Sequence, residues 1–430
     1  MTWQSDISGA DAPAVNPAVP SAAAAGDARA RPADPALMAE WRWYYRRAAW
    51  SAGPPRSLAA GLAHRLRAPF ETAAALRWPG AAVAVRHGIS RPRQFAQLCW
   101  LRTLYGIEAD WYYGLRLYEP ARWARAHGVV RDREVTYVAR YLNAADPARG
   151  RELFGDKLRI AAWCREHGMP TVPTIVVVKK GVVVSGTPQD LPDTDLFSKP
   201  RGSYGGKGAR RWWRHAEGRW ALPTGVIGET VDREGLVAAA CRQTLETGQS
   251  VLVQPALINH PAVAGITSGA LATIRFVTMR TIDGVVQPVL AYYRIPTGTA
   301  MIDSYCVGGL AASIDLPTGR LGRAASLAMS SAAESTDSHP DTGDPITGVV
   351  LPDWPATVAL AKRAHAVAPG LAPVIGWDIA LTPEGPLLVE GNIPPGAAMQ
   401  VAAELPMGET PLVACMIAYL RATDAKHRGS

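Results

Sequence analysis

The pattern of apolar and polar positions divides the chain into a polar N-terminal stretch, a helical region and a longer mixed region. Residues 1–35 contain almost no large apolar side chain. Because such a segment cannot bury enough apolar surface to offset its loss of conformational entropy, we predict that it is disordered. From residue 36 to about 150, apolar side chains recur at helical spacing, for example at Phe95, Leu98 and Leu101. This second region is predicted to be mainly helical.

After residue 150, short β-rich runs alternate with helical segments. Strands are predicted over residues 172–178, 182–184, 195–199, 209–214, 251–254, 271–280, 285–295, 310–316, 321–326, 374–381 and 386–390. Helices are predicted over residues 157–166, 230–248, 354–367 and 411–423. Asp283-Gly284 separates two of the strands and is a strong hairpin signal. Since helices and hairpins are mixed without regular βαβ alternation, the predicted fold class is α+β.

Composition narrows the class of protein. The 430 residues are 48% hydrophobic and 19% charged, as in ordinary globular chains, and the length suggests two to three domains. No apolar run reaches the roughly 18–20 residues of a membrane-spanning helix. The N-terminus, with Asp6 and Asp11, does not resemble a secretory signal. Five scattered cysteines form no CxxC pair, so we predict a cytoplasmic protein without a disulfide framework.

The net charge of +8 favours anionic ligands, among them nucleotides, phosphorylated sugars, nucleic acids and acidic membranes. The helical region mixes arginine with aromatic residues, as in the stretch from Trp41 to Arg47. Two interpretations are open: a patch that binds nucleic acid or a membrane, or an amphipathic domain packed on a catalytic body. We favour the packed domain. No RNA or DNA motif is present, so no nucleic-acid partner is expected.

The predicted hairpin of residues 374–390 bears three oxygen ligands. Asp378 lies on its first strand, and Glu390 and Asn392 lie at the end of the second. Mg²⁺ prefers such ligands and usually takes one or two carboxylates, with water and phosphate oxygens completing its shell. The competing interpretation is a surface hairpin with incidental acidic residues.

A glycine-rich loop follows the predicted strand that ends at Lys199. It contains four glycines within seven residues, and we single out Gly202, Ser203, Gly205, Gly206 and Gly208. Bare amides in such a loop can bind phosphate oxygens, with the lysine charge beneath them. The spacing differs from GxxxxGK[ST] and no helix follows directly, so this is not a P-loop.

Three more positions are candidates for a nucleotide site. Lys157 begins a predicted helix and, like Lys199, stands out in a chain in which most basic residues are arginine. Gln254 ends a buried-looking strand before Pro255. Its amide could meet an adenine edge while Leu257 packs on the ring. Each residue taken alone would more often be an ordinary surface lysine or strand end.

Taken together, these residues resemble the ATP-grasp superfamily in order and spacing. The resemblance is strongest to the branch called sugar-transfer-associated ATP-grasp, which is related to α-L-glutamate ligase-like proteins. The segments Thr273–Val277 and Tyr293-Arg294, followed by Gly308-Gly309, support this branch. The resemblance spans roughly residues 151–423. It implies an ATP-grasp fold over residues 151–250 (phosphate loop) and 251–430 (metal site), preceded by the tail of residues 1–35 and the basic region of residues 36–150.

The resemblance also implies roles. Lys157, Lys199 and the loop from Gly202 to Gly208 would contact the ATP phosphates. Gln254 and Leu257 would line the adenine site, with His260 near the ribose. Asp378, Glu390 and Asn392 would hold two Mg²⁺ ions. Arg275 and Arg294 would face the substrate carboxylate and the acyl phosphate.

Three departures from relatives affect the acceptor chemistry. Many relatives have Glu where this chain has Gln254. D-alanine–D-alanine ligases have Arg two residues before the metal Asp, where this chain has Gly376. Many glutamate-ligase-like members have Asn ahead of the Gly-Gly pair, where this chain has Asp303-Ser304.

The implied function is an ATP-dependent carboxylate–amine ligase, with a role in cell-surface polysaccharide or glycoconjugate synthesis. Its implied partners are ATP, a carboxylate and an amine, either of which could be linked to a sugar. Two alternatives stay open: a phosphotransferase acting on a hydroxyl, and a non-catalytic nucleotide-binding scaffold for glycan assembly. The basic helical region also suggests contact with an anionic membrane or glycolipid at the inner face.

Overall fold

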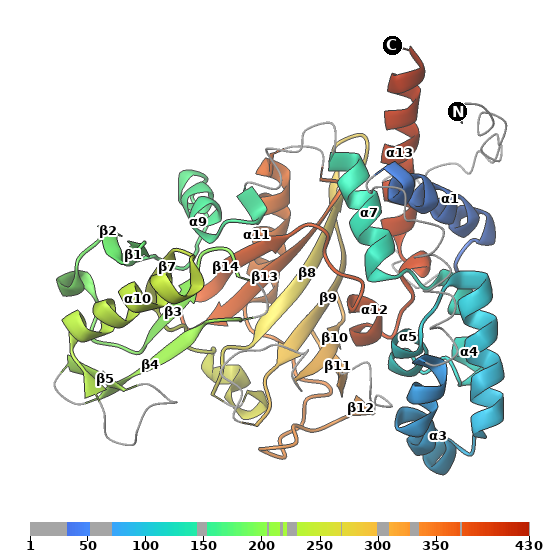
Figure 1. Ribbon diagram of the computed structural model, residues 1–430, viewed down its shortest axis with the longest axis horizontal. Helices are drawn as coiled ribbons and strands as arrows, with labels where there is room; N and C mark the ends of the chain where they lie inside the picture. Colours follow the sequence, from blue (N-terminus) through green and yellow to red (C-terminus); the bar gives the residue numbers. More distant parts are fainter. Residues whose placement is uncertain are drawn as a thin grey trace.

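The computed structural model describes most of the chain. The described residues are 32–51, 71–143, 153–203, 206–215, 218–221, 230–267, 269–298, 309–326, 335–369 and 372–429. The predicted tail of residues 1–35 therefore lies almost wholly outside them, as do Gly205, Asp303-Ser304 and Gly308. Figure 1 shows a group of N-terminal helices at one end of the molecule and two β-sheets that occupy the rest.

The N-terminal region is helical, as predicted. Its elements are α1 (Pro35–Ser51), α3 (Pro79–His87), α4 (Arg91–Tyr105), α5 (Ala109–Gly114), α6 (Pro120–Trp123), η2 (Ala126–Gly128) and α7 (Asp132–Asn143). Proline suits the first turn of a helix, because the backbone N–H groups of that turn have no partner within the helix and none is lost when proline lacks its own. The helices α3, α4 and α6 each have a proline in this position. Gly106 ends α4 in the left-handed conformation with φ of 67°.

The first sheet has seven strands in the order β2-β1-β7-β3-β4-β5-β6. These are β1 (Val176–Lys179), β2 (Val182–Ser185), β3 (Leu196–Pro200), β4 (Arg210–His215), β5 (Arg219–Ala221), β6 (Thr230–Val231) and β7 (Val251–Pro255). The helix α10 (Arg233–Thr247) packs against it through Leu236 and Ala240, which join a core with Trp212 and Trp220. A short 3-10 helix, η3 (Pro188–Asp190), precedes β3.

The second sheet has seven strands in the order β12-β11-β10-β9-β8-β13-β14. These are β8 (Thr273–Arg280), β9 (Val286–Ile295), β10 (Leu310–Ile314), β11 (Leu321–Ser326), β12 (Ser335–Thr336), β13 (Val374–Thr382) and β14 (Gly385–Asn392). The remaining elements are α9 (Lys157–Glu166), η5 (Pro261–Ile266), α11 (Trp354–Val367), α12 (Met399–Ala402), η7 (Met407–Glu409) and α13 (Pro411–Gly429). All pairings between neighbouring strands in both sheets are antiparallel.

The second sheet is covered on both faces, because alternate residues of a strand point to opposite sides. Ile274 and Phe276 of β8 join a core with α9 and α11. Val277 and Met279 of the same strand join a different core, shared with α13 and the N-terminal helices. The N-terminal region therefore packs on the body of the protein, as the packed-domain interpretation expects. The predicted domain boundaries at residues 150 and 250 stay predictions.

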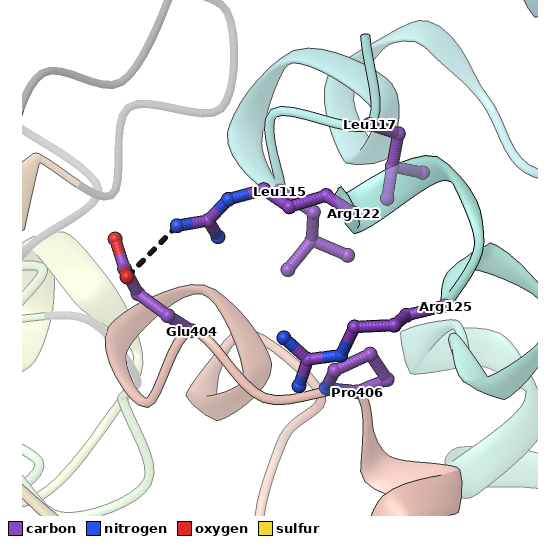
Figure 2. Close-up of a pocket in the computed structure, with 6 residues that line it drawn as sticks. All are labelled: Leu115, Leu117, Arg122, Arg125, Glu404 and Pro406. Atoms are coloured by element: carbon purple, nitrogen blue, oxygen red, sulfur yellow. Dashed lines mark hydrogen bonds and ion pairs between the residues drawn. The ribbon is translucent and has the colours of Figure 1, made fainter. Parts of the chain in front are cut away.

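Ion pairs reinforce this contact between the N-terminal helices and the segment from α12 to η7. Arg116 and Arg122 both pair with Glu404, at 2.5 and 2.8 Å, and Arg125 pairs with Glu409 at 2.7 Å. Figure 2 shows Arg122 directed at Glu404 across a small pocket. Its lining residues are Leu115, Leu117, Arg122, Arg125, Glu404 and Pro406. Because these charges are paired with one another, the pocket offers no unused charge to a ligand.

The predicted element bounds are close for the long elements and less accurate for short ones. The strand expected from residue 172 begins at Val176, since Pro173 interrupts it. Thr230 belongs to β6 rather than to α10, and Asp232 alone caps that helix. The last helix extends past the predicted residue 423 to Gly429. The elements β5, β12 and α12 have two to four residues each and were not predicted.

Candidate functional site

The hairpin β13–β14 places Asp378 directly opposite Glu390, and Gly376 opposite Asn392. Residues directly opposite each other on antiparallel strands share a face of the sheet. The two carboxylates therefore lie side by side, and Asn392 donates through Nδ2 to Glu390 Oε1 at 3.3 Å. The structure thus brings together the three residues that the sequence proposed as metal ligands.

Asp378 is buried and held by two arginines. Arg275 donates from Nε to Oδ1 at 2.6 Å, and Arg294 Nη2 lies 2.8 Å from Oδ2. Burial alone would raise the pKa of Asp378, but these guanidinium groups outweigh it and place the pKa below its usual value. Asp378 is therefore an anion in the folded protein at neutral pH.

Glu390 has the opposite electrostatic balance. Burial, and then the neighbouring charge of Asp378, raise the pKa of Glu390, while Lys157 opposes them. A buried and a partly buried carboxylate side by side repel each other, and a bound cation would relieve that repulsion. The donor set of Asp378, Glu390 and the amide oxygen of Asn392 suits Mg²⁺, which takes few carboxylates. No cluster of three or more His, Cys, Asp or Glu residues is found among the described residues, so phosphate or water oxygens would complete the shell.

Two lysines lie near Glu390 on separate elements. Lys199, on β3, is partly buried, and burial lowers its pKa to about 8, opposed by the charge of Glu390. Lys157 is in the first turn of α9, and burial lowers its pKa as well. Both lysines interact electrostatically with Glu390 and with each other. This is a concentration of positive charge beside the carboxylates, as phosphate binding requires.

The glycine-rich loop is connected to Lys157. The Nζ of Lys157 donates to the carbonyl oxygen of Ser203 at 2.6 Å. The amide of Gly202 donates to Gln249 Oε1 at 3.3 Å. Gly206 and Gly208 have φ of 70° and 74°, which favours glycine, and a Cβ at Gly208 would lie 2.9 Å from Pro200 Cγ. Gly205 lies outside the described residues.

The three candidates for the nucleoside site follow one another along β7 and the segment after it. Gln254 is buried and donates through Nε2 to Thr174 Oγ1 at 3.0 Å. Leu257 is partly exposed just beyond the strand. His260 caps η5 by accepting from the amide of Ala262 at 3.1 Å, so its Nδ1 has a structural role. No hydrogen bond among the described residues connects these positions to Asp378 or Glu390, and their assignment to adenine and ribose stays a prediction.

Arg275 and Arg294 reach Asp378 from two different strands. Arg275, on β8, is directly opposite Asp378 and also donates from Nη1 to the carbonyl oxygen of Pro395 at 2.7 Å. Arg294, on β9, donates from Nε to Thr273 Oγ1 at 2.9 Å. In this arrangement both guanidinium groups bind the carboxylate of Asp378. That they also contact the substrate carboxylate stays a prediction.

Gly376 has a physical explanation. A Cβ at this position would lie 3.0 Å from Pro395 Cβ and 3.1 Å from Arg275 Cδ. Arg275 and Pro395 therefore fill the space beside Gly376, where a larger side chain would need them to move.

Further residues position the candidate site, and among them Asp156 alone has a local signal in the sequence. Asp156 caps α9 just before Lys157 and pairs with Arg201 of the loop. Thr273 holds Arg294, and Pro395 holds Arg275. Asp156 has a local signal, because an acidic residue before a helix is a common N-cap. The other contacts depend on strand register, which a single sequence does not reveal.

A family model matches the sequence over residues 136–408; its description is sugar-transfer-associated ATP-grasp. The match covers more than half of the chain.

No curated protein matches the sequence. Within the described residues, no helix is long and apolar enough to cross a membrane.

Solved structures of low identity also match. The D-alanyl-alanine synthetase A of Vibrio cholerae O1 biovar eltor is 15% identical, with a TM-score of 0.35, and the match covers 63% of this chain and 67% of that one. An N5-carboxyaminoimidazole ribonucleotide synthetase in complex with ADP is 10% identical, with a TM-score of 0.34. That match covers 62% of this chain and 58% of the synthetase, so this chain matches less than two thirds of its length.

Proposed function

Since the chain belongs to the sugar-transfer-associated ATP-grasp family, we propose that it is an ATP-dependent carboxylate–amine ligase that releases ADP. The observation that supports this most is the convergence of Lys157, Lys199, Asp378 and Glu390 at one partly buried site. Two cations beside two carboxylates form a site for a metal-bound polyphosphate. A structural ion alone would not need the lysines.

The proposed reaction has two steps. An oxygen of the substrate carboxylate attacks the γ-phosphorus of ATP, the bond to the β–γ bridging oxygen breaks, and ADP leaves. An amine nitrogen then attacks the acyl carbon, inorganic phosphate leaves with the bonding electron pair, and the nitrogen loses a proton to give the amide. No nucleophilic side chain is required.

The residues of the chain would bind and orient these groups. Lys157 and Lys199 would neutralise the β- and γ-phosphates, and the amides of the loop from Gly202 to Gly208 would close over them. Although burial lowers the pKa of Lys199 to about 8, it is mostly protonated at pH 7, and a bound phosphate would raise that pKa. Low solvent exposure strengthens each of these interactions.

Asp378, Glu390 and Asn392 would hold Mg²⁺, and the resemblance to the family implies two ions. When bound, Mg²⁺ supplies charge neutralisation at the phosphates. Gln254 and Leu257 would contact the adenine, and His260 the ribose. Arg275 and Arg294 would keep Asp378 ionised and oriented, and would lie beside the bound substrate carboxylate.

The branch name supports a role in polysaccharide or glycoconjugate synthesis, with an amino acid or a carboxylated sugar as substrate. A screen for ADP release tests the proposal. Purified protein with Mg²⁺ and ATP is offered single amino acids and uronic acids, and the Glu390→Gln variant is the control. We expect ADP only with a matching carboxylate and amine, and only from the unaltered protein. Equal ADP release by the variant would refute the assigned site.

A further inference from the structure

The helices α3 and α4 expose an unusual amount of apolar surface. Of the fifteen large hydrophobic side chains that are exposed among the described residues, five lie between residues 78 and 104. They are Trp78, Val85, Phe95, Trp100 and Leu104, with exposed fractions of 80, 86, 40, 58 and 49%. A soluble surface usually scatters such residues singly, so their concentration in this short segment makes it a candidate interaction site.

The geometry of α4 places Trp100 and Leu104 together on one exposed flank, with Phe95 on the opposite flank. Gln94, Leu98 and Leu101 are buried and define the inner side. Trp100 and Leu104 are four residues apart, so they are neighbours on the helix surface, away from that inner side. The inner side packs against α3 and the loop after it, where Gln94 donates to the carbonyl oxygens of Gly80 and Ile89 at 3.0 and 2.6 Å. The outward apolar face therefore has no partner within the described part of the chain.

Arginines surround this face. Residues 71–105 contain five arginines and a single acidic residue, Glu71. Glu71 already pairs with Arg102 at 2.9 Å. Arg77, Arg91 and Arg93 are exposed, and Arg93 lies seven residues before Trp100 on the same side of α4. The surface thus combines tryptophan and leucine with a strong positive charge.

We propose that the outward face of α3 and α4 docks on an anionic lipid bilayer surface. Tryptophan favours the level of the lipid headgroups, because its ring is apolar and its N–H is polar. Each arginine near an acidic bilayer adds about 1 kcal/mol of attraction at physiological salt. This inference uses none of the residues assigned to the ligase site and does not depend on that proposal.

The charge of this face argues against a second copy of the chain as its partner. In a two-fold symmetric dimer the same patch meets itself. The exposed arginines of both copies would then be brought together, and residues 71–105 contribute Glu71 alone as an acid, which already pairs with Arg102. An anionic surface satisfies both the apolar side chains and the charges.

The position of the face suits such an arrangement. Figure 1 shows α3 and α4 at the end of the molecule farthest from the first sheet, which bears Lys199 and the glycine-rich loop. Docking through this end leaves that sheet away from the bilayer. The helices pack on the second sheet through a shared core, so the docked face and the body form a continuous structure.

Co-sedimentation of the full chain with vesicles tests the proposal. Vesicles of phosphatidylglycerol and phosphatidylcholine are compared with vesicles of phosphatidylcholine alone, at low and high salt. We expect binding to the anionic vesicles that weakens at least tenfold at high salt, and little binding to the neutral ones. Absence of binding to anionic vesicles at low salt would overturn the proposal.

Matched variants locate the binding surface. Leu104→Ser should weaken binding to anionic vesicles at least fivefold, while Leu245→Ser, at another exposed leucine on α10, should not. Arg91→Gln with Arg93→Gln should weaken it at least tenfold, while Arg165→Gln with Arg242→Gln, which removes the same charge elsewhere, should have a smaller effect. Equal loss in both arginine pairs would indicate non-specific attraction and overturn the proposal.

Two further measurements separate a folding defect or another partner from lipid docking. Thermal unfolding of Leu104→Ser should match that of the unaltered chain, because the side chain is exposed. Size-exclusion chromatography with light scattering reports self-association. A dimer that Leu104→Ser dissociates, together with no vesicle binding, would assign the face to a second copy instead. ADP release should be unchanged in these variants, so a failure of the ligase proposal would be seen separately.

Discussion

Arg275 and Asp378 lie directly opposite each other on β8 and β13, with Nε 2.6 Å from Oδ1 and both side chains buried. This pair couples the proposed metal site to the centre of the second sheet. Arg294 of the next strand completes the arrangement on the other oxygen of Asp378. The carboxylate is thus fixed in place before any ligand arrives.

Asp378→Asn should both destabilise the protein and abolish its turnover. The substitution leaves two buried guanidinium groups without their anion, and breaking a buried pair in this way costs about 3–5 kcal/mol. Urea unfolding measures this loss. An unchanged unfolding midpoint would show that the arginines find other partners in the folded protein.

Lys199→Met should separate activity from stability. The lysine is partly buried, and its desolvation lowers its pKa to about 8, so an apolar replacement should keep or raise the free energy of unfolding. ADP release should fall at least a hundredfold, because a phosphate-binding charge is lost. Lys179→Met, at an exposed lysine of β1, is the matched control. Residual turnover above one tenth in Lys199→Met would remove this residue from the site.

Gly376→Ala should be destabilising by about 1–3 kcal/mol, the usual cost of overpacking. The new Cβ would press on Pro395 and on Arg275, at 3.0 and 3.1 Å. Gly202→Ala, where the nearest atom is a flexible Gln249 oxygen at 3.6 Å, should change the unfolding midpoint far less. Equal midpoints for the two variants would show that the backbone at residue 376 can move aside.

Sequence patterns predicted the long elements and most of the candidate site, because these depend on local signals. The hairpin turn near Glu384 and the cap at Asp156 are examples. The sequence could not predict that Arg275 and Arg294 would both bind Asp378, since this requires the register of three strands. It also could not predict the outward apolar face of α4. Both sides of that helix contain apolar residues, and only packing decides which side is buried.

His365 should make stability depend on pH. It is buried, its ring nitrogens meet Thr278 Oγ1 at 2.7 Å and the Ala372 carbonyl oxygen at 3.1 Å, and burial lowers its pKa to about 4. The unfolded chain therefore binds the proton more tightly, and stability falls as the pH drops from about 6.5 to about 4. The expected loss is about 3 kcal/mol. His365→Asn should lack this component when the two unfolding curves are compared across that range.

Substitutions of Glu134 and Glu404 compare a buried and an exposed ion pair that hold the N-terminal helices in place. Glu134 is buried, accepts from Trp41 Nε1 at 3.0 Å and pairs with Arg131, so Glu134→Gln should cost about 3 kcal/mol. The side chain of Glu404 is 42% exposed, and Glu404→Gln should cost less than about 1 kcal/mol. Chemical unfolding of both variants checks the difference. A larger loss in Glu404→Gln would contradict this ranking.

Hydroxylamine trapping tests the proposed ligase reaction most directly. The protein is incubated with Mg²⁺, ATP, hydroxylamine and the carboxylates that support ADP release, and the hydroxamate product is measured beside ADP. An acyl phosphate predicts hydroxamate in step with ADP from the unaltered chain, and neither product from Glu390→Gln. ADP without hydroxamate would contradict the ligase reaction and favour phosphoryl transfer to a hydroxyl.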